Sequence, residues 1–207
     1  MSIIATNESK GSNYTIVPQG AHVARCYQMI ELGTIKGEFQ GEIKEHKKVR
    51  LSWELPNELK EFKQGEGEKP LVISKDFSLS MHEKANLRKS LEGWRGKSFT
   101  ENEAKRFDVT VLLGKPCMIN IIHTEKDSKI YANISSISAL PKGFECPPQV
   151  NDNFLLSYDN FNFQQFETLP EFIKEKMKET PEFKNLMNLE NNYISQSINE
   201  NEGNQPF

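Results

Sequence analysis

The sequence predicts a mainly β domain, built as a small barrel of five strands with one helix between the third and the fourth. Two observations between residues 21 and 140 lead to this class: three strand-like runs precede a capped amphipathic helix, and two further strand-like runs follow it. The OB-fold has this order of elements, and it commonly binds single-stranded nucleic acid or oligosaccharide. We therefore expect a five-stranded OB-fold barrel over residues 21–140.

The first strand is predicted at residues 21–32, where β-branched, aromatic and polar residues are mixed. Residues 33–48 contain three glycines and several lysines and have no helical stripe. This composition predicts an extended hairpin loop or a splayed pair of strand ends.

Alternation makes the second strand the clearest. Its apolar residues share one parity and polar residues take the other, which is the pattern of a half-buried strand; the apolar residues are Val49, Leu51, Trp53 and Leu55. Trp53 is therefore expected in the core. Pro56 is expected to end this strand, a loop follows to residue 69, and a third strand is expected at residues 71–79.

The helix is predicted from its start and its stop. Ser80 and Glu83 have the spacing of a capping box. Apolar residues then recur at helical spacing, at Leu87, Leu91 and Trp94. Gly93 and Gly96 mark the end of the helix. Trp94 is expected in the core. A second capping box, Thr100 with Glu103, predicts a short connecting helix.

Two further strands are expected at residues 116–124 and 130–140, joined by a turn in the sequence EKDSK. Outside this domain, residues 1–20 are expected to form a flexible arm, and residues 141–187 a linker followed by an amphipathic helix that breaks before Pro181. Residues 188–207 are acidic and rich in asparagine, and we expect this tail to be disordered.

Charge is distributed unevenly along the chain. Residues 1–140 hold 21 Lys/Arg against 18 Asp/Glu, whereas residues 141–207 hold 5 against 11. An acidic tail thus follows a mildly basic body, which favours a polyanionic partner only slightly. The three cysteines, Cys26, Cys117 and Cys146, have no paired spacing, and neither a secretion signal nor a membrane span is predicted. A cytoplasmic protein is expected.

Catalytic motifs are missing from the sequence. His82-Glu83 lacks the second histidine of a zinc-binding helix, and there is no glycine-rich phosphate loop and no nucleophile elbow. We therefore expect no enzymatic activity, no metal and no cofactor.

Binding to a single strand requires cationic groups for the phosphates and flat side chains on which bases stack. An OB barrel carries them on the second and third strands and in the loops that join strands 1 to 2 and 4 to 5. In this chain the residues expected there are Lys36, Phe39, Lys44, Lys47, Lys48, Arg50, Lys75, Lys126, Lys129 and Tyr131. Phe39, flanked by glycines, is the preferred stacking residue.

The acidic tail ends in Pro206 and Phe207. It resembles the tip of bacterial single-stranded DNA-binding proteins, whose acidic tail ends in Pro-Phe and recruits replication and repair enzymes. The residues just before it are less acidic here. The resemblance implies that Pro206 and Phe207 bind a partner protein.

Three segments, KVRLSWELP, SLSMHEKANLRKSLEGWRGKSFT and YANISSISALPKG, together resemble a family of phage-encoded OB-fold single-stranded DNA-binding proteins of replication and recombination modules. The likeness covers about residues 18–187. It implies a non-enzymatic protein that coats single-stranded DNA in the cytoplasm of a bacterial host and recruits replication or recombination proteins. The sequence is compatible with a homo-oligomer but does not predict whether the barrels pair. The alternative is a protein-interaction module, such as an adaptor or an inhibitor of a host enzyme, with no nucleic-acid binding.

Overall fold

The computed structural model describes residues 15–39 and 41–189, without the side chains of residues 38 and 39. Its main feature is a twisted sheet in the order β3-β2-β1-β4-β5, in which each strand pairs antiparallel with its neighbours. The strands are β1 (Gly20–Phe39), β2 (Glu42–Glu61), β3 (Glu68–Ser78), β4 (Pro116–Lys126) and β5 (Lys129–Ser138). A short sixth strand, β6 (Phe154–Leu156), pairs parallel with β1. The mainly β class is confirmed.

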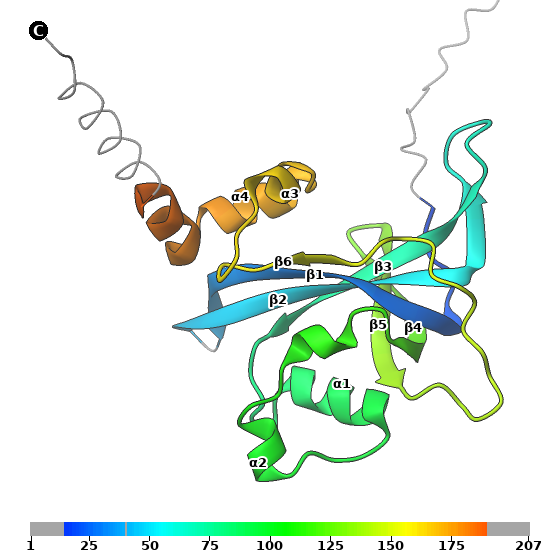
Figure 1. Ribbon diagram of the computed structural model, residues 1–207, viewed down its shortest axis with the longest axis horizontal. Coiled ribbons are helices and arrows are strands. Elements are labelled where there is room, and N and C mark those ends of the chain that lie inside the picture. Colours follow the sequence, from blue (N-terminus) through cyan, green and yellow to red (C-terminus); the bar gives the residue numbers. More distant parts are fainter. Residues whose placement is uncertain (1–14, 40, 190–207) are drawn as a thin grey trace, which may run out of the picture.

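Helices cover both faces of the sheet (Figure 1). On one side lie α1 (Asn86–Arg95) and α2 (Glu101–Ala104), followed by the 3-10 turn η1 (Val109–Leu112). On the other side lie α3 (Phe163–Glu167) and α4 (Glu171–Lys178), and residues 181–189 are helical as well.

Two apolar clusters result from this arrangement. The larger lies between the sheet and α1 and contains Trp53 and Trp94, whose rings are 6.0 Å apart. Both tryptophans are buried, as predicted, and the Trp94 indole Nε1–H donates to the Pro116 carbonyl oxygen at 2.9 Å. The smaller cluster joins β1 to the C-terminal helices through Ile30, Leu32, Leu156, Phe166, Leu169, Ile173, Met177 and Phe183.

The closed barrel is not confirmed, because β3 and β5 lie at the two ends of the strand order and do not pair through their backbones. Lys75 on β3 bridges this seam. Its Nζ donates to the carbonyl oxygen of Ile134 on β5 at 2.7 Å. A side chain therefore satisfies an acceptor that a strand-to-strand hydrogen bond would otherwise use.

The helix predicted from Ser80 begins six residues later, at Asn86. The Ser80–Glu83 capping box does not form; instead the Ser80 hydroxyl accepts the backbone N–H of His82, and the His82 ring accepts that of Lys84. These local bonds favour a turn over a helix start. At its other end α1 stops at Gly96, whose φ of 67° is left-handed, as predicted.

Pro56 does not end β2, which continues to Glu61. It lies in the irregular stretch of the ladder between Leu55 and Leu59, where its missing N–H costs no hydrogen bond. The hairpin predicted after β4 is confirmed. Its turn residues Asp127 and Ser128 have φ values of 51° and 59°, the left-handed conformation of a tight hairpin turn.

The second predicted capping box forms at the start of α2. The Arg95 guanidinium and the Thr100 backbone N–H, in that order, lower the pKa of Glu103 from 4.5 to about 2. A carboxylate whose pKa is depressed in the folded protein stabilises it above its unfolded pKa and loses that effect as the pH falls toward the folded value.

We therefore expect wild-type protein to melt at a higher temperature than Glu103→Gln at neutral pH, and the difference to shrink below about pH 4.5 and to disappear only below about pH 2. Thermal unfolding of both proteins across this range tests the assignment. A difference independent of pH would contradict it.

Candidate nucleic-acid interface

An open hollow of about 750 Å³ lies between the end of β3 and the turn that precedes α1. We call it the basic hollow, because its lining includes three ammonium groups and two imidazoles, those of Lys48, Lys75, Lys84, His46 and His82. Lys48 and Lys75 were predicted from sequence, whereas Lys84 and the histidines were not.

The charge of this hollow is only partly neutralised by the protein. Within the described part of the chain, neither Lys48 nor Lys84 contacts a carboxylate, and Asp76 is the one acidic residue in the lining. Asp76 is itself shared by two cations, Arg50 at 2.9 Å and Lys176 at 3.1 Å. Burial lowers the pKa of Lys75, which disfavours its charged form, so Lys48 and Lys84 are the main sources of positive charge in the hollow. The hollow is therefore cationic and suited to phosphate groups.

Arg50, whose ion-pair partner Asp76 lines the basic hollow, is associated with two exposed aromatic rings. The Arg50 guanidinium carbon is 5.4 Å from the ring centroid of Phe172 on α4. A second hollow, of about 440 Å³, is lined by both Arg50 and Phe62. Phe62 and Phe172 are each 54% exposed, so their faces are accessible for stacking.

Sequence patterns did not single out these two rings. Phe62 falls in the segment predicted as a loop, and Phe172 belonged to the predicted apolar stripe of the C-terminal helix. That stripe is narrower than expected: Ile173 and Met177 are buried, but Phe172 points away from the core. The sequence does place Phe172 directly before Ile173, and two adjacent helical residues cannot both point to the centre of the buried face.

The predicted lysines of the β1–β2 hairpin differ from Lys48 and Lys84, because each has a glutamate within ion-pair distance. The pairs are Lys36 with Glu45 (3.6 Å), Lys44 with Glu42 (3.1 Å) and Lys47 with Glu31 (2.5 Å). The hydrogen bond to Glu31 is the main cause of the raised pKa of Lys47. The Lys36 and Lys44 pairs are exposed and contribute about 0–1 kcal/mol each, so a phosphate can compete for these two lysines, whereas Lys47 is paired with the largely buried Glu31.

The other predicted residues lie elsewhere. Lys126 and Lys129 flank the β4–β5 turn, and Tyr131 on β5 is 47% exposed. This turn lies beyond the start of β1, because Ile121 pairs with Gly20, whereas the β1–β2 turn follows Phe39 at the opposite end of β1. The two loops therefore flank opposite ends of the sheet.

Three predicted residues cannot be placed at this interface. Phe39 ends β1, but its side chain lies outside the described residues, and Pro206 and Phe207 lie outside them entirely.

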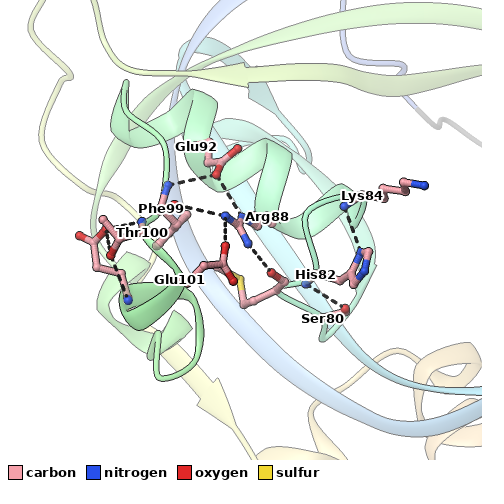
Figure 2. A network of polar contacts seen from close by, with 10 residues as sticks. Ser80, His82, Lys84, Arg88, Glu92, Phe99, Thr100 and Glu101 are labelled. Atoms are coloured by element: carbon pink, nitrogen blue, oxygen red, sulfur yellow. Dashed lines mark hydrogen bonds and ion pairs between the residues drawn. The ribbon is translucent and has the colours of Figure 1, made fainter.

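A buried arginine holds the turn that carries His82 and Lys84 against α1 (Figure 2). The Arg88 guanidinium donates to four acceptors: the carbonyl oxygens of Met81 (3.1 Å) and Phe99 (3.2 Å) and the carboxylates of Glu92 (3.1 Å) and Glu101 (3.2 Å). One side chain thus fixes three separate segments. It gives the wall of the basic hollow a defined position.

Among the described residues, no group of three or more histidine, cysteine, aspartate or glutamate side chains is arranged to hold a metal ion. In the same part of the chain, no helix has both the length and the apolar character required to cross a membrane.

Comparisons with known proteins add no further constraint: no protein-family model matches the sequence, and no curated protein matches it significantly.

Proposed function

We propose that this protein binds single-stranded DNA without catalysing a reaction, and coats it during phage replication or recombination in the cytoplasm of a bacterial host. The observation that carries this proposal is the basic hollow, where Lys48 and Lys84 have no carboxylate partner among the described residues. Its Asp76 pairs with Arg50, against which the exposed ring of Phe172 lies and with which the exposed Phe62 shares a second hollow. Lysines supply phosphate contacts, and each base stacked on an aromatic ring contributes about 1–3 kcal/mol.

The strand order supports an OB-type arrangement. In that fold β1 pairs with both β2 and β4, and a helix between β3 and β4 covers one end of the barrel. The order β3-β2-β1-β4-β5 with α1 after β3 is compatible with it, and the barrel would then be open between β3 and β5. The family resemblance in the sequence favours DNA as the ligand and replication or recombination proteins as partners of the tail.

The direct test is fluorescence anisotropy of labelled oligo-dT and of a duplex of equal length, titrated with the protein at two salt concentrations. We expect preferential binding to the single strand, weakened as salt rises, because phosphate contacts release counterions. Binding to neither probe would overturn the proposal and favour the protein-interaction module.

The lysines of the basic hollow are tested by the double variant Lys48→Ala/Lys84→Ala. Each lost phosphate contact lowers the salt slope by about 0.7 for a single strand, so a decrease of about 1.4 and roughly tenfold weaker binding are expected. The matched control is Lys97→Ala/Lys105→Ala, which removes two exposed lysines that do not line the hollow. Equal affinities of the two variants would exclude the hollow as the binding site.

A further inference from the structure

A third hollow, of about 250 Å³, lies where β1 meets the junction between α4 and the helical residues 181–189. Its lining contains three ammonium groups, those of Lys36, Lys176 and Lys184, against one carboxylate, that of Glu179. We call it the C-terminal hollow. As in the basic hollow, lysines outnumber acidic groups around this concave surface.

The C-terminal hollow adjoins the basic hollow. Lys176 lines the C-terminal hollow, and its Nζ lies 3.1 Å from the carboxylate of Asp76, which lines the basic hollow. The sheet links them as well, because Ile35 in the C-terminal hollow is the cross-strand partner of His46 in the basic hollow. Cations therefore follow one another from β3 across α4 to the start of the last helix.

We propose that a bound DNA strand continues from the basic hollow over α4 into the C-terminal hollow, where its phosphates contact Lys176 and Lys184. The C-terminal helices then form part of the DNA-binding surface, and Phe172 on α4 is a stacking position along the path. This inference rests on the proposed function. It specifies a longer binding site than the sheet alone offers.

The walls of the C-terminal hollow are held together by contacts that require no ligand. Glu182 accepts hydrogen bonds from the backbone N–H and the hydroxyl of Thr34, at 2.9 and 2.6 Å. Gly33 lies so close to Thr180 that an added Cβ would be 2.8 Å from its hydroxyl oxygen. With Ile173 and Met177 buried in the smaller apolar cluster, α4 is fixed against β1 before DNA binds.

Lys176 can leave Asp76 and bind a phosphate without leaving this carboxylate unpaired, because Asp76 has a second cationic partner. The carboxylate of Asp76 is shared with Arg50, which remains its partner when Lys176 turns to the strand. Lys184 has no carboxylate partner in the described residues and is exposed. The two lysines can therefore be removed without leaving a buried charge unpaired.

The test measures affinity for oligo-dT from about 6 to about 30 nucleotides, a range that spans the usual site of one OB-type domain. Proteins compared are the wild type, Lys176→Ala/Lys184→Ala and the control Lys178→Ala/Lys142→Ala. The control removes the same charge, and one of its lysines lies on the same helix but lines neither hollow.

We expect the Lys176→Ala/Lys184→Ala variant to bind the shortest oligonucleotides like the control. On the longest it should bind roughly tenfold more weakly, with a salt slope smaller by about 1.4. If wild type binds and the two variants match at every length, the path over α4 is wrong while the proposed function stands. If wild type binds no oligonucleotide, the proposed function fails and this path fails with it.

Discussion

Glu54→Ala is expected to lower the free energy of unfolding by about 3–5 kcal/mol, because several hydrogen bonds to its carboxylate are lost together. The Glu54 side chain on β2 is completely buried. Its carboxylate accepts the backbone N–H groups of Val150 and Asn151 and the side-chain amide of Asn151, the last two at 2.8 Å. Removal takes the acceptor away from three part-buried donors, and each lost hydrogen bond to a carboxylate costs about 1–3 kcal/mol.

The damage should be largest in the C-terminal part of the chain. Residues 150 and 151 directly precede β6, and β6 leads into the helices that cover β1. Urea unfolding measures the loss of stability, and hydrogen exchange of the β6 amides locates it. The control is Glu125→Ala, an exposed glutamate on β4. Equal urea midpoints of the two variants would show that the contacts of Glu54 contribute nothing to stability.

Glu54 also illustrates which parts of the fold are readable from sequence. The alternation of Val49, Leu51 and Trp53 predicted the strand and its core face correctly, because side chains of a strand alternate between its two faces. The same alternation placed Ser52 and Glu54 toward solvent, yet both are buried. Glu54 contacts Val150 and Asn151, about a hundred residues later, and Ser52 bonds to Gln28 and Ser74 on the neighbouring strands. Local periodicity carries no information about such distant contacts.

Local rules failed where two of them competed. Ser80 and Glu83 have the spacing of a capping box, but the hydrogen bonds of Ser80 and His82 to nearby backbone N–H groups form a turn instead. Thr100 and Glu103, with the same spacing, do form the box, and Arg95 adds an ion pair to Glu103. Spacing alone does not distinguish the two cases, because tertiary contacts decide between them.

The sequence predicted which strands carry the candidate site, but not which of its lysines form ion pairs. Lys48, Arg50 and Lys75 come together on β2 and β3 because strand pairing follows from the hairpin order. Whether a lysine is paired depends on its neighbours in space: Lys36 has Glu45 beside it, whereas Lys48 has no carboxylate partner in the part of the chain that the structure describes. The position of α4 beside this site depends on packing between β1 and residues beyond 160. No sequence motif predicts that packing.

Arg88→Leu is the second substitution with a large expected effect, and it links stability to binding. The Arg88 side chain is buried in α1 and satisfies two carbonyl oxygens and two carboxylates (Figure 2). Leucine fills part of the volume but donates no hydrogen bond, so these acceptors lose their partner. We expect the midpoint of thermal unfolding to fall by about 5–10 °C.

The same variant should bind oligo-dT several-fold more weakly at a temperature where it is still folded, although Arg88 itself contacts no DNA. The reason is positional: Arg88 holds the carbonyl of Met81, and the turn that follows carries His82 and Lys84 into the basic hollow. The control is Lys89→Leu, which replaces the next residue on α1, an exposed lysine. A variant that loses stability but binds like this control would show that the hollow keeps its shape without Arg88, and that its lysines are positioned by the strands alone.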